Sequence, residues 1–471
     1  MSFKPVLLWT DTLFFALLLV GVLTVRYVRR HEALSSAWRK VGRSPVGMAS
    51  ATVLLVFLSI AVADSLHFRP QLPAVAEAPA DAQPVYAVEV LSVLDVALAK
   101  LRTRSEKTYS APFADRLYVR ETVELPEGSQ ARIYPRLLWG GAHLREPAAE
   151  KGADIGQRAL GGAALGLVLW LPLPVLLAAG LARKAGQPFV AALRSVVLGK
   201  TELAWRAALL TLGAIFLIAG AVAALAPWYH VLGTDKVGQD VLYLALKSVR
   251  TALLIGTLTT LIMLPFAVVL GVMAGYLGGW VDDLIQYLYT VLNAIPGVLL
   301  IAAAVLMMQG LIDTHPQWFA TAAERADARL LALCLILGMT SWTALCRLLR
   351  GETLKLREME YVQAARAFGV RTPAILRRHV LPNVMHIVLI ALVMDFSGLV
   401  LAEAVLSYIG IGVDPTMISF GTMINLARAE LARDPMVWWS LAAAFGFMFV
   451  LVLAANLFAD VVRDAFDPRR G

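Results

Sequence analysis

The chain has 471 residues, of which 59% are hydrophobic and only 16% are charged, and its formal net charge is +8. Soluble domains carry roughly 25% charged residues, so this composition excludes an ordinary soluble enzyme and indicates an integral membrane protein. A positive charge would also suit a nucleic-acid partner. Most of the clustered basic residues flank apolar runs, however, and the positive-inside rule accounts for them without nucleic acid.

Nine apolar runs are long enough to cross a bilayer, for which about 18 to 20 apolar residues suffice. The loops after the first, third and seventh runs are rich in Lys and Arg, which predicts that they lie in the cytoplasm. The N-terminus is then expected outside and the C-terminus inside. The predicted spans are about 6–26, 46–66, 159–182, 206–227, 250–277, 284–309, 328–349, 383–406 and 437–460.

Residues 67–158 form a long segment between the second and third spans, on the outer side in this topology. Apolar residues recur at helical spacing over 85–101. Residues 117–137 alternate around a turn at Pro126-Glu127-Gly128, which predicts a hairpin. We therefore expect a small folded α+β insert outside the membrane.

Prolines interrupt three of the predicted spans: Pro172 and Pro174 the third, Pro265 the fifth and Pro296 the sixth. Such breaks are tolerated where neighbouring helices or a water-filled path satisfy the freed backbone groups. Pro296 is therefore a candidate for the wall of a translocation path, and simple kinking for packing is the alternative. Glycines that would let helices approach closely are Gly271, Gly275, Gly278 and Gly279.

A short, turn-rich segment at residues 230–240 precedes the fifth span. Gly233 and Gly238 permit turns, while Thr234, Asp235 and Asp240 can cap neighbouring backbone amides. We predict an ordered elbow at the outer membrane face, and call residues 230–240 the elbow below.

A polar block lies between the seventh and eighth spans and reads Glu-Tyr-Val-Gln-Ala-Ala-Arg-Ala-Phe-Gly over 360–369. Its three alanines, Ala364, Ala365 and Ala367, have small side chains, so another protein could approach one side of a short helix closely. Gly369 can take the positive φ that ends such a helix. The Leu381-Pro382 pair marks the start of the next span, because proline is tolerated in a first turn. This pattern predicts a docking surface for a soluble partner; an ordinary inter-helix loop is the alternative.

Two acidic residues lie in the eighth span, Asp395 near its middle and Glu403 two turns later. Eight residues at about 100° each rotate by about 80°, so the two do not quite share a face. A carboxyl group at membrane depth usually faces the bundle interior or an aqueous path. Both are candidates for a translocation path; a buried carboxyl group with a structural role is the alternative for each.

Signatures of enzyme chemistry are absent from the sequence. The two cysteines and seven histidines form no cluster with metal-ligand spacing, so no metal site is predicted. Residues 198–201, Leu-Gly-Lys-Thr, lack the earlier glycine of a phosphate-binding loop, because position 194 is Arg. The chain is therefore not expected to hydrolyse ATP alone.

Taken in order, these motifs resemble those of bacterial ABC importer permeases, and of the dipeptide/oligopeptide importer subfamily in particular, over roughly 206–471. The polar block is similar to the family's Glu-Ala-Ala loop, with Gln363 in place of Glu. The elbow resembles the Gly-Thr-Asp-x-x-Gly-Arg-Asp signature, with Gln239 in place of Arg. Residues 401–413 resemble the Glu-Ala-x-Leu-Ser-Phe-Leu-Gly-Leu-Gly-Val segment. Positions that match the loop are Ala364, Ala365, Gly369, Leu381 and Pro382.

The resemblance implies a six-helix permease core over 206–471. Residues 1–66 would then be extra membrane helices, 67–158 the insert, and 159–205 a third extra helix with its cytoplasmic loop. It implies a non-enzymatic transport subunit of the bacterial inner membrane that binds no cofactor itself. The implied partners are a second permease, two ATPases that use ATP and Mg, a periplasmic binding protein and a peptide substrate. The membrane depth of Asp395, and not the resemblance, makes this residue a candidate to contact the amino group of the peptide.

Other functions remain open at this point. A nickel, opine or antimicrobial-peptide importer could use the same scaffold. A secondary transporter or channel would predict inverted repeats and paired charges within the membrane. A membrane-anchored assembly protein would make the 67–158 insert its working part.

Overall fold

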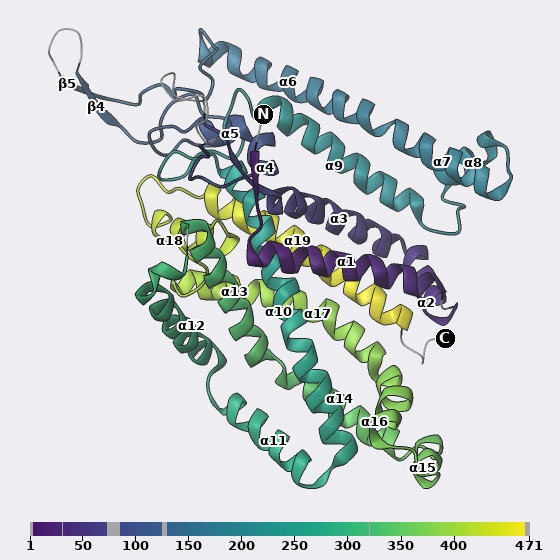
Figure 1. Cartoon of the computed structure of the whole chain (residues 1–471). Coiled ribbons are helices and arrows are strands. Elements are labelled where there is room, and N and C mark those ends of the chain that lie inside the picture. Colours follow the sequence, from purple (N-terminus) through teal and green to yellow (C-terminus); the bar gives the residue numbers. More distant parts are fainter. Residues whose placement is uncertain (1–2, 31, 73–84, 125–129, 320, 467–471) are drawn as a thin grey trace, which may run out of the picture. The chain divides into compact units, whose positions relative to one another are not determined.

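The structure is a computed structural model, and it describes residues 3–30, 32–72, 85–124, 130–319 and 321–466. This part of the chain is mainly helical and carries two small antiparallel sheets (Figure 1). It thus confirms the predicted fold class, an all-α polytopic protein with a small α+β insert. The predicted turn at residues 126–128 lies outside the described residues.

Nine described helical segments are long and apolar enough to cross a membrane, and each overlaps one predicted span. The number and order of the predicted spans are therefore confirmed. The segments are α1 (Trp9–Arg30), α3 (Pro45–Ser65), α6 with α7 (Pro147–Trp170, Pro172–Ala185), α9 (Trp205–Leu225), α10 (Val241–Leu277), α12 (Gly297–Thr314), α13 with α14 (Ala322–Ser341, Thr343–Arg357), α16 to α17 (Thr372–Ile375, a π turn at Leu376–Val380, Leu381–Ile409) and α19 (Trp439–Phe466).

The remaining elements are shorter. The helices are α2 (Glu32–Arg43), α4 (Val93–Ala97), α5 (Ala99–Thr103), α8 (Phe189–Leu198), α11 (Gly279–Ala294), α15 (Glu360–Ala367), α18 (Phe420–Glu430) and a 3₁₀ turn at Pro316–Trp318. The strands are β1 (Phe3–Val6), β2 (His67–Pro70), β3 (Leu91–Ser92), β4 (Glu121–Glu124) and β5 (Gln130–Ile133).

The bounds predicted for the sixth span, 284–309, are wrong, whereas the interruption predicted at Pro296 is present. The chain forms α11, breaks at Ile295 and Pro296, and starts again as α12. Ile295 is extended, with φ −89° and ψ 131°. A proline removes a backbone donor and pushes the residue before it out of the helical region, which explains the break. Pro265, in contrast, lies inside an unbroken α10.

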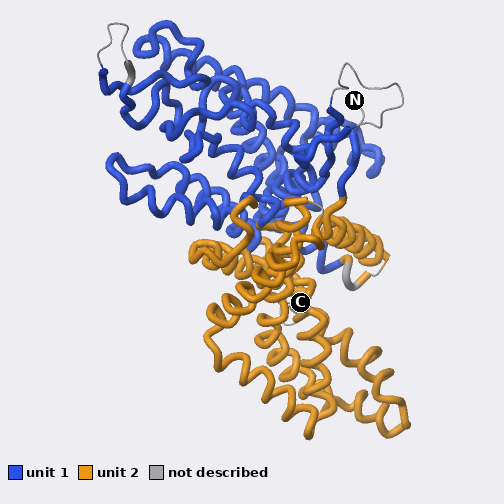
Figure 2. Tube along the Cα trace, turned by 60° about the vertical axis from the view of Figure 1, so that its left-hand side comes forward, with its two compact units in different colours: residues 1–6, 36–251, 418–457 blue, residues 7–35, 252–417, 458–471 orange. Residues whose placement is uncertain are grey.

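The chain divides into two compact units, which we describe separately (Figure 2). The first comprises residues 1–6, 36–251 and 418–457, and the second comprises 7–35, 252–417 and 458–471.

In the first unit, α6 and α9 lie side by side at very short range (Figure 1). A Cβ atom on Gly162 would fall 2.3 Å from the Gly220 carbonyl oxygen, and one on Gly220 would fall 2.3 Å from the Gly162 carbonyl oxygen. Glycine at both positions is what permits this contact. Helix α3 also packs against α9. The two membrane-length helices that precede and follow the insert in the chain, α3 and α6, thus both contact α9.

Both sheets belong to the first unit, and all their strands except β1, which comes from the N-terminus, lie in the insert. Strands β1, β2 and β3 form an antiparallel sheet in that order, and β4 pairs with β5 as the predicted hairpin. The predicted helix over 85–101 is only partly right, since helix begins at Val93. Ser92 caps it, because its hydroxyl accepts from the Asp95 N–H while the Asp95 carboxylate accepts from the Ser92 N–H.

In the second unit, α10 and α14 approach closely through two of the predicted glycines. A Cβ on Gly271 would lie 2.8 Å from the Cys346 carbonyl oxygen, and one on Gly275 would lie 2.6 Å from the Arg350 carbonyl oxygen. At the other end of this unit, the Thr10 N–H of α1 donates to the Asp327 carboxylate of α13 at 3.1 Å.

Candidate functional site

The polar block between α14 and α17 forms a compact helical loop, residues 358–380. Helix α15 runs from Glu360 to Ala367, and Gly369 follows with φ +73°. The Gly369 N–H donates to the Arg366 carbonyl at 3.0 Å, and the Val370 N–H donates to the Ala365 carbonyl at 3.1 Å. A left-handed glycine that closes the last turn in this way ends the helix where the sequence predicted.

The two sides of α15 differ. Val362 is 1% exposed and Ala365 is half-buried, so this side packs onto the protein. Ala364 and Ala367 are exposed, and Phe368 is 87% exposed. The outer side therefore presents small side chains, and the large apolar side chain of Phe368 projects from its end. We call it the docking face.

Gln363 takes the place of the glutamate usual in the family, and its side chain turns back onto its own chain. The Gln363 side-chain amide donates to the Arg357 carbonyl at 2.9 Å. This bond satisfies a carbonyl at the end of α14 and fixes the short connection into α15. Gln363 therefore has a structural partner, although its side chain is exposed.

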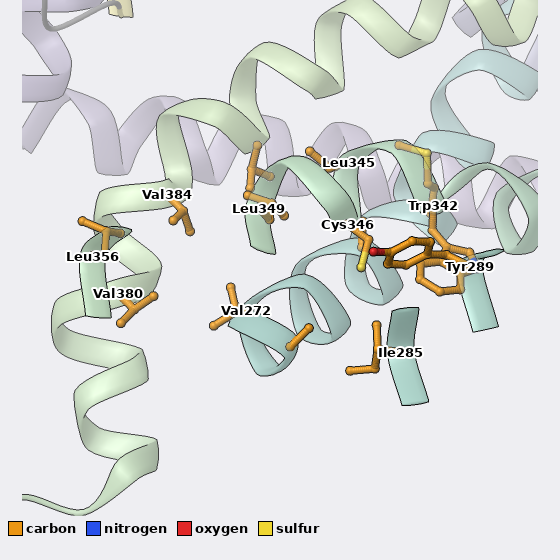
Figure 3. Packing of buried hydrophobic residues seen from close by; sticks show 14 of the residues in the cluster. Val272, Ile285, Tyr289, Trp342, Leu345, Cys346, Leu349, Leu356, Val380 and Val384 are labelled. Atoms are coloured by element: carbon orange, nitrogen blue, oxygen red, sulfur yellow. The ribbon is translucent and has the colours of Figure 1, made fainter. Parts of the chain in front are cut away.

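A buried apolar cluster fastens the loop to the membrane helices (Figure 3). Val362 of α15 and Ile375 of α16 are each 1% exposed within it. Fully burying one such side chain contributes about 1.5 to 3 kcal/mol. The loop is therefore fixed to α10, α11, α14 and α17. Cluster members labelled in Figure 3 are Val272, Ile285, Tyr289, Trp342, Leu345, Cys346, Leu349, Leu356, Val380 and Val384.

An ion pair reinforces this attachment. The Arg350 guanidinium of α14 donates twice to the Asp282 carboxylate of α11, Nε to Oδ1 at 2.6 Å and Nη2 to Oδ2 at 2.7 Å. A paired, planar contact of this kind fixes orientation as well as distance. Arg357 Nη1 also donates to the Tyr276 carbonyl at 3.4 Å, next to the turn that joins α10 to α11. These contacts join α14 to α11 and to the turn that precedes it.

The three residues predicted for a translocation path all belong to the second unit. Asp395 is half-buried in α17, and its side chain has no hydrogen-bond partner among the described residues. Glu403, 1% exposed, accepts from the Ser407 hydroxyl one turn later at 2.6 Å. Pro296 is exposed at the break between α11 and α12. Glu403 therefore has a hydrogen-bond partner within its own helix, whereas the Asp395 side chain has none among the described residues.

An ion-pair cluster that sequence reasoning missed lies beyond the end of α17. Arg329 of α13 contacts the carboxylates of Asp414, at 2.5 Å, and of Asp313. Burial raises the pKa of Asp414, but hydrogen bonds from Thr416 and the nearby Arg329 outweigh it and hold this pKa below its usual value. The Gly-Val-Asp-Pro turn at 412–415 is the only local signal that could have pointed to Asp414.

The elbow is ordered much as its residue types predict. Gly233 and Gly238 both have positive φ, +72° and +78°. The Asp235 carboxylate accepts from the Val237 and Gln239 amides at 3.0 and 2.8 Å. The Asp240 carboxylate accepts from the Leu242 amide at 2.9 Å, which caps the start of α10.

The elbow is also fastened to the insert, which the sequence did not predict. The Thr234 N–H donates to the Ser110 carbonyl at 3.0 Å, and the Ser110 N–H donates to the Thr234 hydroxyl at 2.7 Å. The Glu106 N–H donates to the Gly238 carbonyl at 2.9 Å. Trp439 of α19 adds a bond from its indole N–H to the Thr234 carbonyl, also at 2.9 Å. Insert, elbow and α19 are thus joined by hydrogen bonds in each of which at least one partner is a backbone group.

A buried histidine lies at the centre of this junction. His230 Nδ1 is 2.8 Å from an Asp240 carboxylate oxygen, and its Nε2 is 3.3 Å from Glu106 Oε1. Burial lowers the pKa of His230, but the hydrogen bonds and charges of Asp240 and Glu106 outweigh it and raise this pKa to about 9. Burial raises the pKa of Glu106, but the contact with His230 and amides such as those of Leu138 and Trp139 bring it below its usual value. The histidine is therefore a cation at neutral pH.

A second buried charge cluster ties an N-terminal helix to α10. Lys247 Nζ of α10 lies 2.8 Å from the Asp64 carboxylate of α3 and 3.0 Å from that of Asp95 in α4. Three residues further along α10, Arg250 Nε donates to the Ser65 hydroxyl at 3.1 Å. Helix α3 and the insert are thus fixed to a helix of the predicted permease core.

Among the described residues, nine helical segments of membrane length define the class: a polytopic membrane protein. The family described as "Binding-protein-dependent transport system inner membrane component" matches residues 267–471. The oligopeptide transport system permease protein OppC of Mycobacterium bovis is 32% identical over 239 residues, which are 51% of this chain and 76% of that relative. The glutathione transport system permease protein GsiD of Pectobacterium atrosepticum is 33% identical over 243 residues, 51% and 73% of the two chains.

A third relative, the dipeptide transport system permease protein DppC of Bacillus subtilis, is 28% identical over 240 residues, 51% of this chain and 69% of that relative. The chain belongs to the ABC importer permease family of binding-protein-dependent inner-membrane components, in its dipeptide/oligopeptide branch. It is accordingly a multi-pass inner membrane protein and a transport subunit.

Proposed function

We propose that this chain is the transmembrane subunit of an ATP-driven importer for di- or oligopeptides. It would receive the substrate from a periplasmic binding protein and release it to the cytoplasm by alternating access. The names of its relatives, which are oligopeptide, dipeptide and glutathione permeases, support a peptide substrate. The observation that carries the proposal is α15: one side is buried in the membrane-helix core, and the other presents Ala364, Ala367 and the 87% exposed Phe368.

In this proposal the N-terminus is periplasmic and the C-terminus is cytoplasmic. A separate ATPase subunit binds the docking face. A second permease and a second ATPase would complete the membrane assembly. This chain binds no nucleotide itself; its residues transmit the movement. Val362 and Ile375 carry it into the buried cluster, and the Arg350–Asp282 pair carries it into α11.

The break at Ile295 and Pro296 gives α11 freedom to turn relative to α12, because no helical hydrogen bonds continue across an extended residue there. The Asp395 carboxyl group, half-buried on α17, would meet the amino group of a passing peptide. On the periplasmic side, the elbow and the insert fastened to it would face the loaded binding protein.

A pair of glycine substitutions tests the central step. Gly369→Leu introduces a side chain at φ +73° in open space at the end of α15. Gly410→Leu does the same at φ +88° at the end of α17, also in open space, and is the matched control for backbone strain. We expect Gly369→Leu to lose co-purification of the ATPase and dipeptide uptake at normal membrane abundance. Gly410→Leu should keep ATPase co-purification.

Two results would overturn the proposal. One is dipeptide transport by the purified, reconstituted chain without any ATPase. The other is labelling of a cysteine placed at the exposed Ala364 from the periplasmic side of intact cells.

A further inference from the structure

A basic surface lies where α2 meets the connection between α8 and α9, within the first unit. Residues 36–44 and 199–206 contain five basic side chains and one acidic side chain, Glu202. The Ala204 N–H donates to the Gly42 carbonyl at 2.8 Å, which holds the two segments together. We call the five basic residues the basic patch: Arg39, Lys40, Arg43, Lys200 and Arg206.

The basic side chains of α2 point away from its packed side. Val41 is 4% exposed, and a Cβ on Gly42 would lie 2.8 Å from the Leu203 side chain, so these positions face the 199–206 connection. Arg39, Lys40 and Arg43 are exposed. At about 100° per residue they fall on the opposite side of the helix. The patch is therefore an open surface.

Most of this charge is uncompensated. Arg43 pairs with Glu202 at 3.3 Å, and both side chains are more than half exposed. In the part of the chain that the structure describes, the other four members of the patch have no carboxylate partner. An exposed surface with this excess of cations favours an anionic ligand.

Chain connectivity places the patch at the membrane surface. Helix α2 joins the membrane-length helices α1 and α3, and the 199–206 connection leads from α8 into the membrane-length helix α9. Exposed apolar side chains lie near the basic residues in the chain: Val197 is 60% exposed, Leu198 47% and Trp38, on the same side of α2 as Val41 and Gly42, 37%. Basic residues with exposed apolar residues next to them in the chain, one of them a tryptophan, are typical of a segment that lies in the headgroup region of a bilayer.

We propose that the basic patch binds the phosphodiester headgroups of anionic phospholipids in the leaflet that it borders. Val197, Leu198 and Trp38 would rest against the first carbons of the acyl chains. Charge complementarity selects an anionic lipid over a zwitterionic one, and the nearby apolar residues select a lipid over a free phosphate ion. The patch lies outside the family match at 267–471, so the proposal does not depend on the proposed transport function.

Quenching of Trp38 fluorescence by brominated lipids tests this proposal on the full chain. The chain is placed in phosphatidylcholine nanodiscs that contain an equal fraction of brominated phosphatidylglycerol or brominated phosphatidylcholine. The difference between the chain and its Trp38→Phe variant isolates the signal of Trp38. We expect brominated phosphatidylglycerol to quench this signal more strongly. The preference should vanish in 1 M NaCl, where the Debye length is about 3 Å.

Two charge-matched variants complete the test. R39Q/K40Q removes two unpaired cations of the patch, and R132Q/R145Q removes two exposed cations of the insert. We expect R39Q/K40Q to raise the phosphatidylglycerol fraction needed for half-maximal quenching by about tenfold, since each basic residue near an anionic surface contributes to binding. R132Q/R145Q should leave that fraction unchanged.

Equal quenching of Trp38 by the two brominated lipids in the unmodified chain would overturn the proposal. So would an unchanged lipid preference in R39Q/K40Q. If R39Q/K40Q instead loses a co-purifying protein while its lipid preference persists, a protein occupies the patch and the lipid assignment is wrong.

Discussion

The Glu106 carboxylate and the His230 imidazole meet at 3.3 Å although 124 residues separate them in the chain. Their side chains are only 1% and 5% exposed. The contact lies among backbone hydrogen bonds that join the insert to the elbow, such as that from the Glu106 N–H to the Gly238 carbonyl. The side of the elbow that faces the insert is therefore covered, and a partner cannot reach it without displacing the insert.

The stability of this junction should depend on pH in a direction set by His230. Its pKa rises from 6.5 to about 9 on folding, so its contribution is complete below about pH 6.5 and is lost as pH rises through 9. The shift corresponds to a contribution on the order of 3 kcal/mol. The pKa of Glu106 is lowered, so its own contribution is lost only as the solution becomes acidic.

We expect the insert to become increasingly sensitive to added protease as the pH rises from about 6.5 to 9. His230→Gln should be sensitive already at neutral pH and should show little change over that interval. Identical profiles of cleavage against pH for the two proteins would contradict the role assigned to His230.

Gly238→Ala should detach the insert from the elbow. The added Cβ would lie 1.8 Å from the Glu106 carbonyl oxygen, at a φ of +78°. Gly186→Ala is the control, because Gly186 has φ +63° and nothing within 4 Å of the added atom. The control should lose about 1 to 2 kcal/mol through backbone strain alone. Thermal unfolding should show a larger loss for Gly238→Ala, and equal losses would mean that the backbone contact is easily relieved.

Lys247→Met should destabilise the protein strongly, because it leaves the buried carboxylates of Asp64 and Asp95 without their cation. Removal of one partner from a buried ion cluster costs about 3 to 5 kcal/mol. Adding Asp64→Asn and Asp95→Asn to the same chain should restore much of the loss. Thermal unfolding in one detergent compares the three proteins, and a triple variant no more stable than Lys247→Met would exclude an electrostatic cause.

Arg350→Lys should weaken the transmission of movement from α15 to α11. Lysine keeps the charge but cannot make the paired contact with Asp282, whose two oxygens now lie 2.6 and 2.7 Å from the guanidinium. In the reconstituted importer we expect ATP hydrolysis to continue while peptide uptake per ATP falls about tenfold, because coupling between the two subunits is weakened. Lys355→Arg, which alters an exposed pair with Glu352, serves as control. Equal losses of hydrolysis and uptake in Arg350→Lys would point to failed ATPase binding instead.

Local signals account for what the sequence could predict. Apolar runs of sufficient length predicted nine spans, and the Ala-rich stretch before Gly369 predicted a helix that ends there, as α15 does. The apolar run continues across Pro296, so the bounds predicted for the sixth span also cross it; mean hydropathy does not register an extended residue such as Ile295.

Contacts between distant segments could not be predicted in this way. Glu106 with His230, and Lys247 with Asp64 and Asp95, are pairs that no local periodicity marks. The residue types in the elbow suggested turns and caps, and these are present. Nothing in its sequence showed that Thr234 would also bind Ser110 of the insert.

Thr234 also limits how this chain can be shortened. Its hydroxyl and amide are saturated by residues 108 and 110, which come from the stretch that precedes the family match. A chain shortened to begin at α9 would contain every helix expected of the family. In its elbow, however, the Thr234 N–H and the Gly238 carbonyl would lose their hydrogen-bond partners, and the protonated His230 would lose the Glu106 carboxylate. Shortened versions should therefore keep the segment from Glu106 to Ser110, supplied as a separate peptide if necessary.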